Sequence, residues 1–397
     1  LAARKGHIHM SRKLIGAVAS LAAASLLVAA CSSSSEESTD AAVTEETAAA
    51  EVTEDAAEEV AEEAVAAGGK ACVILPDAAS SARWETADRP FLEQAFTAAG
   101  VEYDIQNANG DKAKFQTIAD GMLASGCGVM AVVNLDSETG SAVIAKATAA
   151  GVPVIDYDRL TLGGGAQYYV SFDNVAVGTA IGEGLIKCLG DAGVTEGPVA
   201  LLNGSPTDNN ATLFKQGYQA ALEGAGFTVA ADQAVPDWDN TKAGTIFEQM
   251  YTEANGDFVA VASANDGLGG AAIAVLDRNG QAGAIPVSGQ DATDEGLQRV
   301  LMGTQCVTVY KAVKKEAEAA AALAVALLNG DSAAADALAT GSTTDSEAGT
   351  EVPSVLLEPQ PIYADTVIDV INDGFTTAEN VCATDELMEK CVEFGIQ

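Results

Sequence analysis

From residue 70 onward, short apolar runs alternate with longer segments in which apolar residues recur every three or four positions. The short runs predict buried strands, and the longer segments, which mostly end at glycine, predict amphipathic helices. Buried strands that alternate with helices are typical of a parallel sheet covered on both faces. In the first series we expect strands and helices in turn at residues 71–75, 89–99, 102–107, 112–124, 128–134, 140–150 and 152–157.

The same alternation begins again after residue 174 and predicts a second lobe of the same kind. The sequence therefore predicts an α/β protein of two doubly wound parallel-sheet lobes. Ligands of such sheets bind beyond the carboxyl ends of the strands, so the ligand should lie in the cleft between the lobes. The second series, helix first, covers residues 175–189, 198–202, 210–225, 228–235, 243–254, 258–263, 267–279, 286–289, 306–310 and 313–328.

The residues before this alternation have the pattern of a targeting segment. A short basic start at residues 10–13 leads into an uncharged apolar run over residues 14–30, which ends in small residues directly before Cys31. This arrangement resembles a bacterial lipobox, which implies a lipoprotein signal peptide over residues 1–31 and lipid attachment to Cys31. A single membrane-spanning anchor is the alternative, although the run is short for a span and no basic stop-transfer segment follows it.

Residues 32–69 have the composition of a spacer. They hold twelve acidic residues and neither lysine nor arginine, and like-charge repulsion keeps such a segment extended. We expect a flexible acidic tether here, with an exposed acidic helix as the alternative.

Composition and charge exclude several classes of function. The 397 residues carry a formal net charge of −37, which excludes nucleic acid and anionic membrane as electrostatic partners. The two histidines, His7 and His9, precede the expected cleavage site, so the mature chain has none for a Ser-His-Asp mechanism or a catalytic zinc site. Because no CxxC spacing occurs either, we expect no metal and no cofactor.

Polar and aromatic residues gather at the predicted strand ends. Carboxylates accept hydrogen bonds, Arg and Lys donate them, Asn does both, and indole faces pack on the apolar faces of a pyranose. This set of side chains favours carbohydrate binding, although Asp and Asn are also ordinary turn and helix-cap residues and the tryptophans could belong to the core. The candidates are Arg83, Trp84, Asp158, Arg159, Asn209, Asn210, Trp238, Asn265, Asp291 and Lys311.

The order and spacing of these motifs resemble the D-xylose-binding proteins of bacterial ABC importers, within the ribose/galactose-type periplasmic binding proteins. The resemblance covers about residues 70–375. It is carried by Ala82-Arg83-Trp84, Tyr157-Asp158-Arg159, the run 204–211 with Asp208-Asn209-Asn210, Asp237-Trp238, Ala264-Asn265-Asp266, Gln290-Asp291 and Tyr310-Lys311.

The resemblance implies a type I periplasmic binding protein, with two lobes joined by three hinge segments that close on one pyranose. Residues 70–174 plus 309–350 would form the N-terminal lobe, and residues 175–308 plus 351–397 the C-terminal lobe. The tryptophans would sandwich the sugar ring, and the other candidates would hydrogen-bond it.

The expected function is therefore capture of a monosaccharide, D-xylose or another pyranose such as glucose or galactose. The implied partners of this monomeric, lipid-anchored extracytoplasmic protein are an ABC permease and its ATPase. A sugar sensor for a chemoreceptor or kinase remains an alternative. A hydrolase with paired carboxylates, such as Asp156 with Asp158 or Asp237 with Asp239, is disfavoured because residues two apart on a strand do not flank a bond.

Six cysteines remain after Cys31, enough for three disulfides in an extracytoplasmic chain. Cys382 and Cys391 lie close in sequence, and Cys72 and Cys127 begin strands expected to be neighbours. Elimination leaves Cys188 with Cys306. Buried free thiols are the alternative.

Overall fold

A computed structural model describes residues 68–396 of the chain. The expected signal peptide, the lipidation site Cys31 and nearly all of the acidic tether lie outside these residues. Within them, no helix is both long enough and apolar enough to cross a membrane.

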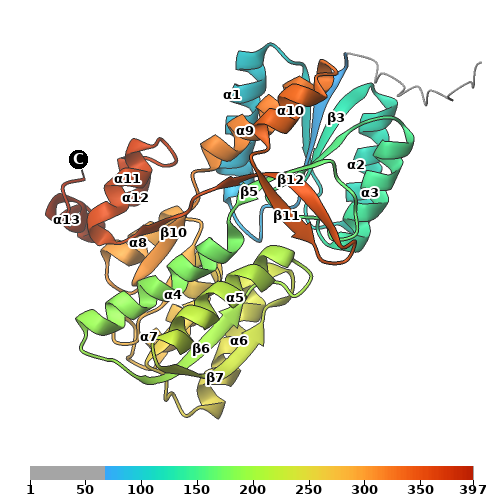
Figure 1. The fold of residues 1–397 in the computed structure, drawn as a ribbon. Helices are drawn as coiled ribbons and strands as arrows, with labels where there is room; N and C mark the ends of the chain where they lie inside the picture. Colours follow the sequence, from blue (N-terminus) through green and yellow to red (C-terminus); the bar gives the residue numbers. More distant parts are fainter. Residues whose placement is uncertain (1–67, 397) are drawn as a thin grey trace, which may run out of the picture. The chain divides into compact units, whose positions relative to one another are not determined.

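The first lobe is built on one sheet of seven strands in the order β11-β12-β5-β4-β3-β1-β2 (Figure 1). All neighbours are parallel except β11 and β12, which form an antiparallel hairpin at one edge. The strands are β1 (Lys70–Leu75), β2 (Tyr103–Asn107), β3 (Cys127–Val132), β4 (Val154–Tyr157), β5 (Tyr168–Phe172), β11 (Gly341–Asp345) and β12 (Thr350–Leu357).

Helices cover both faces of this sheet, because successive side chains of its central strands point to opposite faces. In β1, Val73 packs in one apolar cluster with residues of α1 and α9, whereas Ile74 packs in another with residues of α2 and α3. The helices of this lobe are η1 (Trp84–Asp88), α1 (Arg89–Ala99), α2 (Lys112–Ala124), α3 (Ser137–Ala149), α9 (Val313–Leu328) and α10 (Ser332–Leu338).

The second lobe has a sheet in two parts, β7-β6-β8 and β9-β10-β13, which a parallel bridge between Val261 and Val287 links. Only β13 is antiparallel to its neighbour. The strands are β6 (Gly197–Asn203), β7 (Phe227–Ala234), β8 (Ala260–Ser263), β9 (Ser288–Gln290), β10 (Val307–Tyr310) and β13 (Gln360–Ile362).

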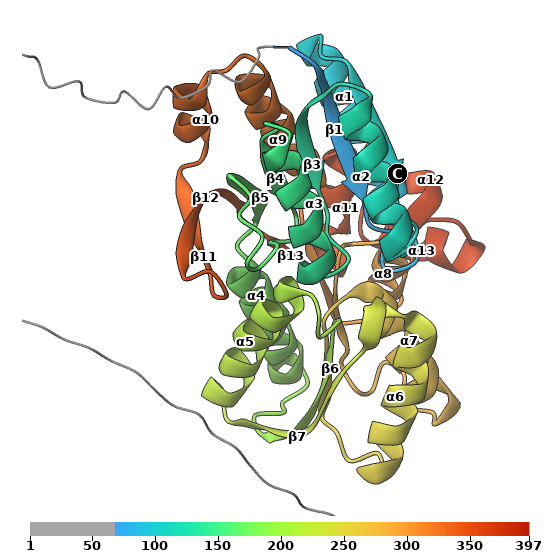
Figure 2. The same ribbon diagram turned by 90° about the vertical axis from the view of Figure 1, so that its right-hand side faces the viewer.

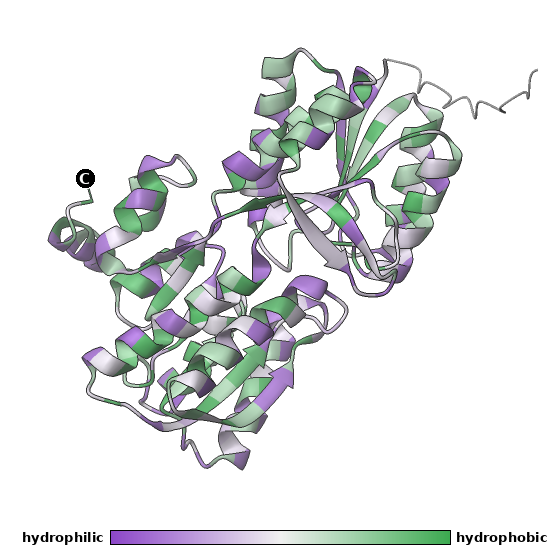
Figure 3. Cartoon of the chain, viewed as in Figure 1, coloured by the Kyte–Doolittle hydropathy of each residue, from purple (hydrophilic) through white to green (hydrophobic). Residues whose placement is uncertain are grey.

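Helices of the second lobe pack on this sheet, and a group of short helices at the carboxyl end packs beside β10. Figure 2 shows α12 and α13 of this group beside α8. Hydrophobic residues concentrate in the strands of both lobes, while hydrophilic residues lie mainly on outer helix turns and loops (Figure 3). The helices are α4 (Asn174–Asp191), α5 (Asn209–Gly224), η2 (Pro236–Trp238), α6 (Asn240–Glu253), α7 (Asp266–Arg278), α8 (Asp294–Leu301), η3 (Ala364–Thr366), α11 (Val367–Asn372), α12 (Ala378–Val381) and α13 (Asp385–Glu393).

Three chain segments cross between the lobes, directly after β5, β10 and β12. Two expected boundaries are wrong. Residues 351–357 belong to the first lobe, because β12 pairs in parallel with β5 and extends its sheet. Residues 309 and 310 belong to the second lobe, because Val309 pairs with both Gln290 and Pro361.

The structure forms three disulfides, Cys72–Cys127, Cys188–Cys306 and Cys382–Cys391. These are the pairs expected from strand order, sequence separation and elimination. Each joins elements of a single lobe, so none ties one lobe to the other.

Candidate functional site

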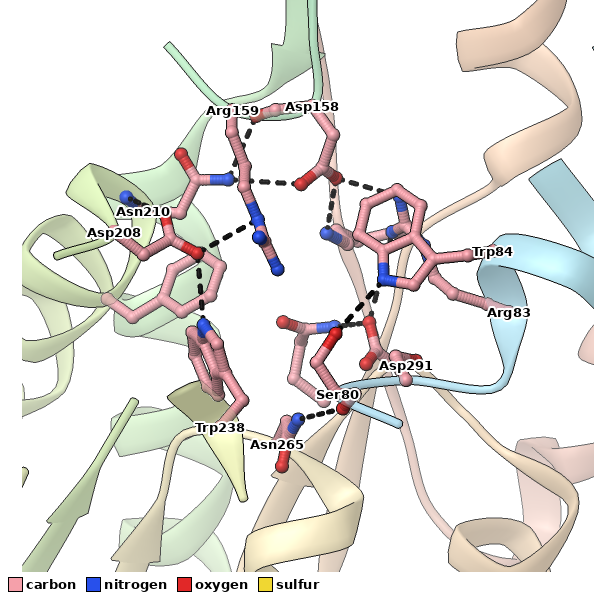
Figure 4. Close-up of a pocket in the computed structure, with 14 residues that line it drawn as sticks. Ser80, Arg83, Trp84, Asp158, Arg159, Asp208, Asn210, Trp238, Asn265 and Asp291 are labelled. Atoms are coloured by element: carbon pink, nitrogen blue, oxygen red, sulfur yellow. Dashed lines mark hydrogen bonds and ion pairs between the residues drawn. The ribbon is translucent and has the colours of Figure 1, made fainter. Parts of the chain in front are cut away.

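The strand ends of both lobes line one narrow cavity, whose free volume is about 30 Å³. First-lobe residues come from the segments after β1 and β4, and second-lobe residues from α5, from the segments after β6, β7 and β8 and from the end of β9 (Figure 4). Lys311 comes from the crossing after β10. The lining residues are Ser80, Ser81, Arg83, Trp84, Asp158, Arg159, Asp208, Asn210, Phe214, Trp238, Asn265, Gln290, Asp291 and Lys311.

Nine of the ten candidate residues line this cavity, and Asn209 does not. Asn209 is the first residue of α5 and lines a separate outer hollow, whereas Asn210 is the second. Successive helical residues are turned by about 100°, so the two amides cannot point to the same side. The expectation that Asn209 lies in the site is therefore wrong.

Arg83 lies directly before η1 and is held from several sides. Its Nε donates to Asp88 at 3.0 Å, and its Nη2 donates to Asp158 at 2.8 Å. Although burial opposes ionisation, these carboxylates raise the pKa of Arg83 further above its ordinary value. Its Nη1 has no hydrogen-bond partner among the described residues. Arg83 therefore keeps one fixed donor for a ligand.

Asp158 stands at the end of β4 in the left-handed backbone region, with a φ of 61°. Its carbonyl accepts hydrogen bonds from Tyr169, Ser171 and Asn210, which hold this turn. Lys311 donates to its carboxylate at 2.9 Å. Burial opposes ionisation, but Lys311 and Arg83 hold the pKa of Asp158 well below its usual range. Asp158 is therefore a charged acceptor.

Two acidic residues behind the cavity behave differently. Burial raises the pKa of Asp88 to about 6, against the attraction of Arg83. Burial and the charge of Asp158 raise the pKa of Glu316 well above its ordinary value. Glu316 stands 3.5 Å from Arg83, and both of its oxygens lack a hydrogen-bond donor among the described residues. Burial therefore favours the neutral form of Glu316, which lowers the negative charge beside the cavity.

Two indoles stand on opposite sides of the cavity, with the Arg159 guanidinium pointing into the space between them (Figure 4). The indole nitrogen of Trp84 donates to Ser80 at 3.3 Å, and that of Trp238 donates to Asp208 at 3.0 Å. Each also packs in the core of its own lobe. Because their polar atoms are satisfied, their contribution to the cavity is apolar surface.

Contacts across the cleft join the two lobes. Arg159 forms an ion pair with Asp208 at 3.0 Å, and the amide of Asn265 donates to the backbone oxygen of Ser80 at 3.4 Å. Asp208 and Asn265 also cap α5 and α7. For these two residues, the helix-cap interpretation and the place at the cavity both hold.

Five lining residues were not among the candidates, namely Ser80, Ser81, Asp208, Phe214 and Gln290. Phe214 could have been found, because it lies four residues after Asn210 on the same helix face. Gln290 and Asp208 lie within motifs already singled out. The two serines carry no signal beyond their proximity to Arg83.

The carboxylate pairs considered for hydrolysis are not arranged for it. Asp156 lies outside the cavity and accepts two hydrogen bonds from Thr161, both at 2.7 Å. Asp237 also lies outside the cavity and pairs with Lys242 at 2.6 Å. Within the described residues, no group of three or more side chains is placed to hold a metal ion.

Residues 69–332 match the family model of a periplasmic binding protein domain. The chain belongs to the periplasmic binding protein family. The D-xylose-binding periplasmic protein of Escherichia coli is 34% identical over 74% of this chain and 87% of that protein. The protein of the same name from Haemophilus influenzae is 33% identical over 75% of this chain and 88% of that protein.

A solved structure gives the same fold. It is a carbohydrate transporter solute binding protein from Chloroflexus aurantiacus in complex with D-glucose. Its TM-score is 0.68 at 25% identity, over 78% of this chain and 97% of that one. The expected type I periplasmic binding protein fold is therefore confirmed, and the chain is a solute-binding protein rather than an enzyme.

Proposed function

We propose that this periplasmic binding protein captures one neutral monosaccharide, D-xylose, in the cavity between its lobes and delivers it to an ABC permease. The observation that carries the proposal is a polar cavity between two indoles, in which the cations already have carboxylate partners. Such a site has little charge left over for a charged ligand, and it offers donors and acceptors for several hydroxyl groups.

Different side chains of the cavity would contact different parts of the sugar. The free Nη1 of Arg83 would donate to one hydroxyl, and the carboxylate of Asp158 would accept from another. Charge-assisted hydrogen bonds are about twice as strong as neutral ones, which offsets the loss of water from the sugar. Trp84 and Trp238 would cover the two faces of the ring. A sugar held by both lobes stabilises the closed form over the open one.

The choice of D-xylose is supported by the two relatives at 34% and 33% identity, which are D-xylose-binding proteins. D-glucose is the second candidate, because the solved relative holds it in the same fold. The two sugars differ by one hydroxymethyl group, so the size of the cavity beside that carbon would separate them.

Isothermal titration calorimetry tests the ligand. The full chain with Cys31→Ser, which cannot be lipidated, is titrated with D-xylose, D-glucose, D-galactose, D-ribose and L-arabinose. We expect D-xylose to bind at micromolar concentration or below and the others more weakly. Tighter binding of glucose would transfer the proposal to the second candidate, and no binding of any of the five would overturn it.

Anchoring and delivery belong to the same proposal. We propose that Cys31 carries a lipid and that residues 32–69 hold the binding domain away from the membrane. Metabolic labelling with a fatty acid tests the anchor, since the natural chain should take up the label and Cys31→Ser should not. Equal labelling of both chains, or no labelling of the natural chain, would remove the lipid anchor.

A further inference from the structure

Asp208 forms the tighter of two ion pairs between the lobes among the described residues. It belongs to the second lobe, directly before α5, and its side chain is only 5% exposed. Its Oδ2 pairs with the Nε of Arg159, which follows β4 in the first lobe, at 3.0 Å. The other ion pair across the cleft among the described residues, Arg83 with Asp291, is looser at 3.9 Å.

The same carboxylate also positions an indole. Oδ2 accepts the indole N–H of Trp238 at 3.0 Å, while Oδ1 accepts the backbone N–H of Asn210 at 2.9 Å. One side chain thus caps α5, orients Trp238 and bonds to the opposite lobe. When the lobes separate, only the bond to Arg159 must break, because the other two lie within the second lobe.

Asp208 also lines two neighbouring hollows. A second, larger hollow of about 530 Å³ adjoins the cavity. The two spaces share four lining residues, which therefore separate them: Ser80, Arg159, Asp208 and Trp238. Three of these four are joined through Oδ2 of Asp208. A ligand that moves from the cavity into this hollow would pass beside the Arg159–Asp208 ion pair.

We propose that Asp208 is a latch residue, which holds the closed form by its ion pair with Arg159 and thereby slows release of the sugar. It acts through Arg159 and Trp238, so it is a positioning residue. The inference rests on the proposed function. It predicts an effect on the dissociation rate, because encounter with the open form does not use the latch.

Asp208→Asn is the variant that isolates the latch. Asparagine caps helices about as well as aspartate and still offers an oxygen to Trp238, but it cannot form the ion pair. We expect the dissociation rate constant of D-xylose, measured by stopped-flow tryptophan fluorescence, to rise about tenfold to a hundredfold. The association rate constant and the Tm of the sugar-free protein should stay unchanged. If Asp208→Asn does not purify, Asp208→Ser offers another capping side chain.

A matched control separates the latch from loss of an acidic cap. Asp331 caps α10, accepts the backbone N–H group of Ala334 at 2.9 Å, and lines neither the cavity nor the neighbouring hollow. Asp331→Asn should leave both rate constants unchanged. An equal rise in both variants would overturn the latch.

A double-mutant cycle separates the latch from direct contact with the sugar. If Asp208 acts through Arg159, adding Arg159→Gln to Asp208→Asn should give less than the product of the two single effects on dissociation. Fully multiplicative effects would overturn the latch and make Asp208 a direct ligand contact. An unchanged dissociation rate in Asp208→Asn, with xylose still bound by the natural protein, would overturn the latch alone. No sugar binding by the natural protein would overturn the proposed function as well.

Discussion

Trp238 lies where it does because a neighbouring position has no side chain. Gly204 directly follows β6, and a Cβ at Gly204 would fall on the benzo ring of Trp238. We predict that Gly204→Ala displaces the indole and weakens sugar binding about tenfold or more, since overpacking costs about 1–3 kcal/mol. Calorimetry measures the change. Gly244→Ala, in open space on α6, is the control, and unchanged affinity in a folded Gly204→Ala would remove Trp238 from the site.

Asp156 makes stability depend on pH. Burial raises its pKa to about 7, from an ordinary value of about 3.9. Between these values the folded protein holds a proton that the unfolded chain has released. The free energy of unfolding should therefore fall as the pH rises from about 4 to about 7. Asp88 and Asp266, whose pKa values burial raises to about 6, act in the same direction.

The test compares Asp156→Asn with the natural chain by thermal unfolding at several pH values. Asparagine resembles the protonated carboxyl, so the variant should show a smaller loss of Tm from pH 5 to pH 8, about the range that spans this pKa. Asp277→Asn, at an exposed position on α7, should keep the natural slope. A natural chain that grows more stable over this range would contradict the prediction.

At the scale of single residues, the sequence identifies the side chains that line the cavity better than the buried side chains that support them. Glu316 and Glu318 stand in the same alanine-rich run, yet Glu316 is fully buried beside Arg83 and Glu318 is exposed. Nothing local distinguishes them, because the buried face of α9 is fixed by the sheet on which it packs. Asn209 and Asn210 present the same difficulty at the start of α5.

At the scale of elements, α4 and α5 pack so closely that glycine is required between them. A Cβ at Gly178 on α4 would overlap the backbone carbonyl of Phe214 on α5. We predict that Gly178→Ala lowers the free energy of unfolding by about 1–3 kcal/mol, as overpacking does. Gly190→Ala on the same helix meets open space and should raise it by about 0.5–1 kcal/mol. Urea titration of both variants gives the two free energies of unfolding. If both substitutions changed this free energy in the same direction, the packing argument would be refuted.

The elements that the sequence reveals are those with local signals. The expected alternation of short strands and helices up to residue 157 is present, because apolar runs and glycine stops are read within a few residues. Strand β5 was not predicted, although all five of its residues are buried. Strands β11 and β12 were not predicted either, because alternate residues are exposed and β12 pairs with β5 at a distance of about 185 positions. Nothing near β12 in the sequence indicates this pairing, which also explains why the expected lobe boundary at residue 350 is wrong.

At the scale of the whole molecule, the covalent links leave closure free. Cys72–Cys127 lies within the first lobe, Cys188–Cys306 within the second, and Cys382–Cys391 joins two short helices at the carboxyl end. The lobes are connected by three chain crossings and by polar contacts at the cleft. Substitution of a single cleft residue such as Asp208 can therefore change the stability of the closed form without disrupting the core of either lobe.

Charge acts on the molecule as a whole and on its site in different ways. The chain has 57 acidic and 20 basic residues, so exposed carboxylates repel one another in the folded state. Salt screens that repulsion, since the Debye length falls from about 10 Å at 0.1 M to about 3 Å at 1 M. We predict that raising sodium chloride over this range increases Tm.

Sugar affinity should change less than about twofold, because the ion pairs of the cavity are buried and the ligand is neutral. Scanning calorimetry and titration calorimetry measure the two effects separately. A steep dependence of affinity on salt would indicate a charged ligand and would contradict a neutral sugar.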